Sequence, residues 1–385
     1  MEGLQVVFEG SRLDLHFGRD ASVVATGIVA ILSLSNKEKA VNTLDASFQP
    51  EARECLQLLK NQGPSLGLLV ICSRLPASFL HGGDVKLQST FTRTEEARAG
   101  VEELKALLRA IETLPCPTVA LMHATTLGGG LEVALACDYR FAAPECKAIG
   151  LPELQLGVLP GAGGCVRLPR LIGLQPAVEL ILGSKVIDAT KAADLGIING
   201  ILPLPFWGLE DASPPWWPTL ASKLKAIKPT ALGMKKYPFQ LRGHTWLEKK
   251  LLQTVALRKI ELATKSLYPA PRACLDVLLR AWQADYEEAM DIETQGYLQL
   301  CLTSEAKALM SLFLNKSVLK HEAVDLLGAP ASIPLHVFVL GSGWMGTGIG
   351  HQLALNGAIV TLYDVEDEAL LSAKRRVDSL NETLV

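Results

Sequence analysis

The fold of the first part of the chain is decided by the stretch Thr126-Leu127-Gly128-Gly129-Gly130-Leu131-Glu132. Three successive glycines open an apolar helical pattern, and a strand-forming run at residues 118–122 comes just before them. Backbone N–H groups at the start of a helix have no intrahelical partner, and the helix dipole favours negative charge there. The stretch therefore predicts a strand-to-helix turn that can stabilise an oxyanion.

Two glutamates accompany this glycine-rich backbone. Glu132 ends the stretch, and Glu153 follows 21 residues later, just before the turn Leu-Pro-Gly-Ala-Gly-Gly at 159–164. Either carboxylate alone is most simply read as solvated or as a helix cap. The apolar frame around Glu132, at residues 131–138, argues against a merely solvated carboxylate. Taken together, and beside glycine-rich backbone, the two carboxylates favour a functional site over two solvated side chains.

Composition narrows the function classes. The chain has 385 residues, a hydrophobic content of 49% and a net charge of -3, which is typical of a globular protein of more than one domain without a basic surface for nucleic acid. The longest apolar stretch, residues 21–35, is shorter than a membrane span. The eight cysteines lack a C-x-x-C pair and predict buried thiols in a reducing compartment. The histidines show no H-x-x-x-H pair, so we expect no metal site.

Apolar runs and helical patterns alternate along the first 200 residues, which predicts an α/β domain. The expected strands are 27–34, 66–72 and 118–122, and the expected helices are 50–60 and 95–114. A connecting loop rich in proline and tryptophan is expected at 203–218, followed by helices at 247–260, 273–284 and 286–320. A new domain then begins with residues 335–340, which read as a buried parallel strand. We expect domains at 1–202, 203–329 and 330–385.

These segments, together with Phe79-Leu80-His81-Gly82-Gly83-Asp84, resemble the crotonase (enoyl-CoA hydratase/isomerase) superfamily. The resemblance implies the ClpP-like spiral β-β-α fold of that superfamily, with the N–H groups of Gly83 and Gly129 as the two oxyanion donors. The family pattern at the first donor is Ala-Gly-Ala-Asp, so His81 and Gly83 depart from it. Glycine at that position gives the donor more backbone freedom.

The resemblance also implies roles for the two carboxylates. Glu132 would activate water for attack at C3 of a trans-2-enoyl-CoA, and Glu153 would deliver a proton to C2, giving a 3-hydroxyacyl-CoA. Gly161 would support the turn beside this water. Glu153 could also move a proton between C4 and C2, so 3,2-enoyl-CoA isomerisation is an expected second activity. Lys37, Lys39 and Lys86 flank segments that lie near the nucleotide end of coenzyme A in the family, although solvated lysines account for them as well.

A second motif starts at the C-terminal strand. Gly341-Ser342-Gly343-Trp344-Met345-Gly346 follows the apolar run, opens a helical pattern and precedes Asp364 after a second strand at 358–363. The context matches a dinucleotide-binding fingerprint, in which Gly341, Gly343 and Gly346 shape the pyrophosphate turn and Asp364 accepts from the adenosine ribose. The acidic residue favours NAD over NADP. A purely structural βαβ turn is the alternative.

In this order the segments resemble the α-subunit of the fatty-acid β-oxidation multifunctional enzymes, which fuse an enoyl-CoA hydratase to a 3-hydroxyacyl-CoA dehydrogenase. The Rossmann unit is incomplete here, so we expect the dehydrogenase activity to be absent. The resemblance implies a coenzyme A thioester substrate, and a thiolase subunit or a homo-oligomer as partner. It implies the mitochondrial or peroxisomal matrix in a eukaryote, or the bacterial cytoplasm.

Two other functions stay open at this stage. The first is a non-catalytic acyl-CoA-binding or assembly subunit, in which the atypical loop at His81 and Gly83 no longer forms a productive oxyanion hole. The second is a remnant NAD-binding protein. Acyl-CoA binding without turnover would identify the first, and measurable NAD affinity would identify the second.

Overall fold

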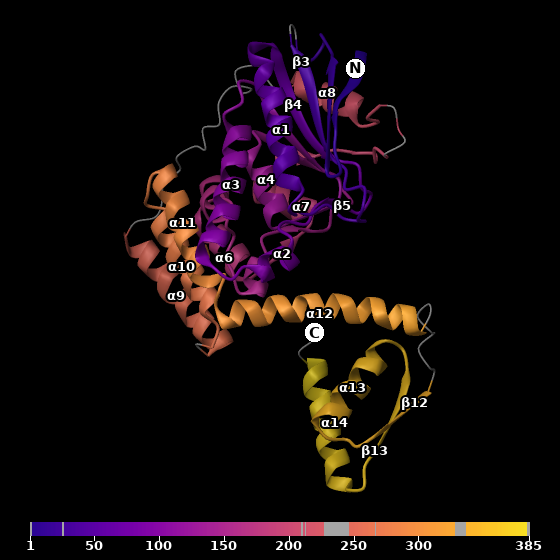
Figure 1. The fold of residues 1–385 in the computed structure, drawn as a ribbon. Coiled ribbons are helices and arrows are strands. Elements are labelled where there is room, and N and C mark those ends of the chain that lie inside the picture. Colours follow the sequence, from indigo (N-terminus) through magenta and orange to yellow (C-terminus); the bar gives the residue numbers. More distant parts are fainter. Residues whose placement is uncertain are drawn as a thin grey trace. The chain divides into compact units, whose positions relative to one another are not determined.

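The computed structural model describes residues 2–24, 27–208, 211, 213–226, 246–265, 267–327 and 336–382. The chain divides into two compact units, Met1–Leu314 and Asn315–Val385. Each unit has its own sheet or sheets with helices packed against them (Figure 1).

The larger sheet of the first unit has seven strands in the order β1-β2-β3-β4-β6-β8-β11. The first three strands pair antiparallel and the rest pair parallel. Their bounds are β1 (Glu2–Glu9), β2 (Leu13–Arg19), β3 (Ile28–Leu34), β4 (Leu66–Ser73), β6 (Thr118–Met122), β8 (Tyr139–Ala142) and β11 (Gly200–Ile201). The three strands expected from the sequence are thus confirmed as β3, β4 and β6, and β1 and β2 precede them.

A smaller sheet has four strands in the order β10-β9-β7-β5. Its strands are β5 (Ser78–Leu80), β7 (Thr125–Leu127), β9 (Ile149–Gly150) and β10 (Val186–Ile187). In two successive repeats a strand of the large sheet leads into a strand of the small sheet and then into a helix. These are β4, β5 and α2 (Val85–Thr90), and β6, β7 and α4 (Gly129–Ala136). This repeat is the expected spiral β-β-α arrangement.

Helices cover both sheets. The first unit contains α1 (Phe48–Asn61), α2 (Val85–Thr90), α3 (Thr94–Glu112), α4, α5 (Gly164–Ile172), α6 (Leu174–Leu182), α7 (Ala189–Asp194) and α8 (Trp217–Ala226), with short 3₁₀ turns η1 (Gly63–Ser65) and η2 (Glu153–Leu156). The helical extension comprises α9 (Trp246–Thr264), α10 (Pro269–Ala281), α11 (Tyr286–Leu300) and α12 (Ser304–Leu327). The single helix expected at 286–320 is therefore two helices, α11 and α12. The hydroxyl of Thr303 accepts from Ala306 N and caps the start of α12.

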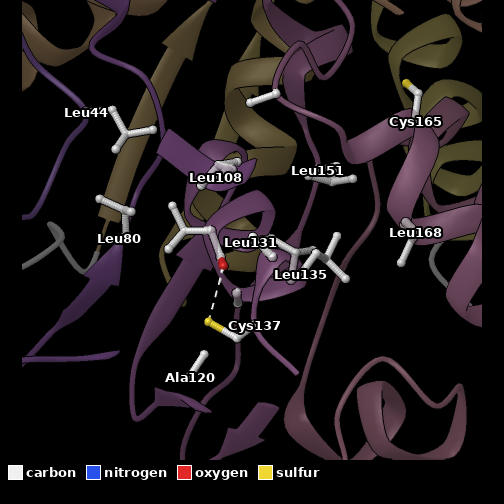
Figure 2. Packing of buried hydrophobic residues seen from close by; sticks show 14 of the residues in the cluster. Leu44, Leu80, Leu108, Ala120, Leu131, Leu135, Cys137, Leu151, Cys165 and Leu168 are labelled. Atoms are coloured by element: carbon white, nitrogen blue, oxygen red, sulfur yellow. Dashed lines mark hydrogen bonds between the residues drawn. The ribbon is translucent and has the colours of Figure 1, made fainter. Parts of the chain in front are cut away.

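The large sheet is buried on both faces. Alternate residues of β3 belong to different apolar clusters, with Ala30 and Leu32 toward the helices α1, α3 and α4, and Val29 and Ile31 toward Trp207 and Trp217. This two-sided burial explains why the strands read as continuous apolar runs. Figure 2 shows part of the first cluster, including Leu131 and Leu135 of α4.

The segment expected to be a loop, 203–218, has no regular helix before Trp217, and α8 begins there. Pro218 follows the first helical residue, a place where the missing N–H of proline costs nothing. Trp207 and Trp216 are buried against the sheet instead of lying on a solvated connection.

The second unit contains β12 (His336–Leu340) and β13 (Ile359–Tyr363), which pair parallel, with α13 (Trp344–Leu355) and α14 (Asp367–Glu382). Residue 335, which the sequence analysis placed in this strand, lies outside the described residues. The expectation that the strand is buried was wrong, because Phe338 is 72% and Leu340 is 80% exposed. Among the described residues the sheet has two strands only, so one set of side chains faces no second layer.

Candidate active site

The N-terminus of α4 lies beside the loop that follows β5. Gly82 has φ +90°, and a Cβ added there would lie 2.9 Å from Gly129 N. Only glycine combines this left-handed backbone with so close an approach. A Cβ added to Gly129 would in turn lie 3.6 Å from Gly83 N. The amides of Gly83 and Gly129, the two expected oxyanion donors, are therefore brought together.

Backbone pairing and a helix cap fix this loop. Leu44 N donates to Gly82 O at 2.8 Å, and Asp84 N donates to Leu44 O at 3.3 Å. The Asp84 carboxylate caps α2 by accepting from Lys86 N and Leu87 N. Asp84 thus braces the loop that contains Gly82 and Gly83.

Glu132 lies on the first turn of α4 and is 3% exposed. Its Oε1 accepts from Ala162 N and from Gly164 N, each at 2.8 Å. Burial, and next the negative charge of Glu293, raise the pKa of Glu132 to about 7, while the two N–H donors and Arg167 act in the opposite direction. A carboxylate with this pKa and two donors on one oxygen can act as a base near neutral pH.

Glu153 begins η2 and is held differently. Its Oε2 is buried without a hydrogen-bond partner among the described residues, and its Oε1 would lie 3.2 Å from a Cβ added to Gly128. Burial, and next the charge of Glu132, raise the pKa of Glu153 well above its usual range. Burial therefore raises the pKa of both carboxyl groups, and the two groups differ in their hydrogen-bond donors.

Gly161 comes directly before Ala162, whose N–H donates to Glu132. A Cβ added to Gly161 would lie 3.0 Å from Cδ2 of Tyr297, a residue of α11. The glycine thus lets the helical extension approach the turn. Burial raises the pKa of Tyr297 far above its usual value, so its phenol is neutral.

The sequence analysis missed a third carboxylate, Glu293, on α11. Glu293 is fully buried and accepts from Gly163 N at 2.6 Å and from Cys165 N at 2.8 Å, and Lys105 Nζ lies 3.1 Å away. A signal was present, because Glu293 falls on the buried face of α11 defined by Ala289, Met290, Thr294 and Tyr297. A charged residue inside an apolar stripe indicates a buried contact.

Other candidate residues have structural partners. Lys37 pairs with Glu9 and Asp14, and Lys39 with Asp84 and Asp45, whereas Lys86 is exposed. All eight cysteines are free and buried, as expected.

Across the described ranges, no group of three or more histidine, cysteine, aspartate or glutamate side chains is arranged to hold a metal ion. In those ranges no helix has the length and hydropathy of a membrane span.

The glycine-rich turn of the second unit contains the three glycines of the expected fingerprint. A Cβ on Gly343 would meet no atom within 4 Å, so a phosphate can approach this backbone and the N-terminus of α13. A Cβ on Gly346 would overlap Gly341 O, so close packing of α13 on the turn needs glycine. Asp364 follows β13 and accepts from Ser342 N and Ser342 Oγ through Oδ2. The four expected residues therefore lie at one turn.

Two protein families match the chain. The family described as Enoyl-CoA hydratase/isomerase matches residues 25–228. The family described as 3-hydroxyacyl-CoA dehydrogenase, NAD binding domain, matches residues 336–385. A curated relative, the fatty acid oxidation complex subunit alpha of Vibrio parahaemolyticus, is 35% identical over 350 residues, which are 90% of this chain and 48% of the relative. The chain thus spans about half the length of the curated relatives it matches.

Solved structures with a similar fold include two bacterial proteins. An enoyl-CoA hydratase from Bacillus halodurans has a TM-score of 0.53 at 22% identity, over 77% of this chain and 99% of that one. An enoyl-CoA hydratase/isomerase from Xanthobacter autotrophicus Py2 has a TM-score of 0.53 at 20% identity, over 84% of this chain and 100% of that one. At these identities the likeness concerns the fold, and it confirms the crotonase architecture predicted from the sequence.

Proposed function

Because the chain belongs to the enoyl-CoA hydratase/isomerase family, we propose that it adds water to trans-2-enoyl-CoA and releases 3-hydroxyacyl-CoA, as in fatty-acid β-oxidation. The observation that carries the proposal is the difference between two buried carboxylates beside the paired amides of Gly83 and Gly129. Glu132 has two N–H donors and a pKa of about 7, whereas the Oε2 atom of Glu153 has no partner among the described residues. Hydration needs one base and one acid in this arrangement.

The reaction follows from these positions. The amides of Gly83 and Gly129 stabilise the negative charge that collects on the thioester oxygen. Glu132 takes a proton from water as the water oxygen bonds to C3, and Glu153 gives its proton to C2 of the resulting enolate. The net change is addition of one water molecule across the double bond. The proton on Glu132 then returns to Glu153 directly or through solvent, which restores the starting state.

The direct test is the loss of the conjugated enoyl-thioester absorbance when the purified protein meets crotonyl-CoA. Glu132→Gln and Glu153→Gln are measured alongside, with circular dichroism to show that each variant is folded. Turnover by the wild type that both variants lose supports the two-carboxylate hydratase. A folded wild type that binds acyl-CoA without turnover contradicts it.

Isomerisation of 3-enoyl-CoA is the second activity that the site supports. Glu153 lies beside Gly128. As a carboxylate it would take a proton from C2, and after the double bond shifts it would return that proton to C4. Proton transfer of this kind needs Glu153 and no water nucleophile. We therefore expect Glu132→Gln to retain more isomerase than hydratase activity, measured with a 3-enoyl-CoA.

The runner-up is an acyl-CoA-binding or assembly subunit without catalysis. The loop at His81 favours it, because Nε2 of His81 is buried with no hydrogen-bond partner in the described part of the chain. A binding assay separates the two functions, since this alternative predicts acyl-CoA affinity and no absorbance change. Such a result would leave the carboxylates as structural groups.

The second unit extends the proposal to a cofactor. Gly341, Gly343 and Gly346 would hold the pyrophosphate of NAD, and Asp364 would accept from the adenosine ribose. When bound, NAD would supply a hydride acceptor. The relative from Vibrio parahaemolyticus is named as a subunit of a complex. We therefore also propose assembly with a thiolase subunit or with a second copy of this chain. The proposed compartment is the cytoplasm in a bacterium, or the mitochondrial or peroxisomal matrix in a eukaryote. The domain division at 202/203 and 329/330 remains part of this proposal.

A further inference from the structure

The turn that binds Glu132 is held from two sides. Its N–H groups alternate along the chain, since Ala162 and Gly164 donate to Glu132, whereas Gly163 and Cys165 donate to Glu293. Four successive backbone amides thus serve two buried carboxylates. Any movement of one carboxylate displaces the donors of the other.

Lys105 of α3 neutralises the third carboxylate. Its Nζ lies 3.1 Å from Glu293 Oε1 and also donates to Met290 O at 2.6 Å and to Thr294 Oγ1 at 2.7 Å. The Lys105 side chain is 13% exposed and that of Glu293 is 0% exposed, so water screens the pair little. A buried charge with this number of partners is held in one place.

We propose that Glu293 and Lys105 form a positioning pair that fixes the 162–165 turn, and with it the two N–H donors of Glu132. The inference rests on the proposed function, because it concerns the base of the hydration step. It also assigns a role to the helical extension, since α11 supplies Glu293 to a site whose other carboxylates come from α4 and η2.

The charges that face Glu132 come from several elements. Glu293 on α11 raises its pKa and Arg167 on α5 lowers it. Glu153 on η2 is coupled to it by charge. Lys105 on α3 counters Glu293, and Tyr297 and Cys165 face the cluster with pKa values raised by burial. Glu293 thus acts on Glu132 through the backbone turn that both carboxylates hold and through its charge.

Two substitutions separate the charge of the pair from its packing. Glu293→Gln removes the negative charge, so the acid limb of kcat/KM moves to lower pH by roughly one unit, and kcat falls about tenfold because Glu132 becomes a weaker base. Lys105→Met removes the positive charge, so the acid limb moves to higher pH. Glu288→Gln, an exposed position on the same helix, is the matched control and keeps the wild-type profile.

Opposite shifts in the two variants support the pair, since a general loss of packing would not move the profile in opposite directions. An unchanged profile in Glu293→Gln, or equal shifts in both variants, overturns the proposal. If Glu293→Gln does not fold, Glu293→Asp is the milder variant. It keeps the charge and shortens the side chain, so kcat is expected to fall several-fold with KM little changed. A wild-type kcat in that variant overturns the proposal.

An infrared measurement separates this inference from the proposed function. The carboxyl band of Glu132 is assigned by its loss in Glu132→Gln and titrated in protein without substrate. The pair predicts that the band titrates at lower pH in Glu293→Gln than in the wild type, whether or not the protein hydrates crotonyl-CoA. If the wild type hydrates crotonyl-CoA and the Glu132 band titrates at the same pH in both proteins, only the positioning pair is overturned. If the band shifts but the wild type does not hydrate crotonyl-CoA, only the proposed function is overturned.

Discussion

The turn at 161–164 in the first unit and the turn at 341–346 in the second are both glycine-rich, and both donate backbone N–H groups to a carboxylate. Glu132 accepts from Ala162 N and Gly164 N, and Asp364 accepts from Ser342 N. The pKa of Glu132 is nevertheless raised, chiefly by burial, whereas the pKa of Asp364 is lowered, chiefly by the Ser342 amide. Backbone N–H donors thus accompany a raised pKa in the first turn and a lowered pKa in the second.

Burial accounts for the difference. Moving an ionised carboxylate out of water costs several kcal/mol, more than the roughly 1.5–3 kcal/mol that a hydrogen bond to a charged group returns. Glu132 is 3% exposed and has the charge of Glu293 nearby. Asp364 keeps contact with water, so its donors act almost unopposed. The carboxylate of a glycine-rich turn therefore has a raised pKa only where the fold closes over it.

The largest expected effect is on turnover at the buried turn. Glu132→Gln and Glu153→Gln each remove one partner of the proton transfer, so we expect kcat for crotonyl-CoA hydration to fall about 10²–10⁴-fold. Asp364→Asn leaves kcat for hydration unchanged, because its carboxylate belongs to the other turn. Loss of hydration in Asp364→Asn would contradict the separation of roles between the two turns.

The second effect concerns stability and pH. The folded protein holds a proton on Glu132 up to about pH 7, whereas the unfolded chain releases it near the usual value of 4.5. The free energy of unfolding should therefore fall as pH rises through this window, by up to roughly 3 kcal/mol. Glu132→Gln keeps an oxygen acceptor for both amides and removes the titration. Urea unfolding at pH 5 and pH 8 should show the wild type losing stability relative to this variant, and parallel curves would contradict the raised pKa.

A third effect compares the glycines of the two turns. A Cβ added to Gly164 would lie 3.0 Å from Glu132 Oε1 and 2.7 Å from Pro160 Cβ, whereas one added to Gly343 would meet nothing within 4 Å. We expect Gly164→Ala to lower the free energy of unfolding by about 1–3 kcal/mol and to reduce turnover. Gly343→Ala should change stability by about 0.5 kcal/mol or less. If urea unfolding shows the same loss of unfolding free energy in Gly164→Ala and Gly343→Ala, the space around the two glycines does not distinguish the turns.

The same contrast explains what the sequence could predict. Gly129 and Glu132 are close in sequence and Glu153 follows 21 residues after Glu132, so a short stretch and its resemblance to a family were enough to propose them. Glu293 meets Gly163 and Cys165 across 130 and 128 residues, and no local pattern encodes that pairing. The apolar run of β12 likewise did not reveal that one set of its side chains would be exposed, because an apolar run does not state how many layers cover it.

The smallest expected effect lies at the exposed turn. The pKa of Asp364 is lowered, so the carboxylate should stabilise the turn above the pKa of the unfolded chain, and this contribution should fade as pH falls through the lower folded value. Asp364→Asn removes the charge, so hydrogen exchange at the Ser342 amide should become several-fold faster near neutral pH. The rate of crotonyl-CoA hydration is the control and should not change. Glu366→Gln, which changes a neighbouring carboxylate by the same charge, should leave Ser342 protected. If the Ser342 amide exchanges at the same rate in both variants, its protection comes from the packing of α13 and not from Asp364. The turn at 341–346 would then be stabilised by packing, as the turn at 161–164 is.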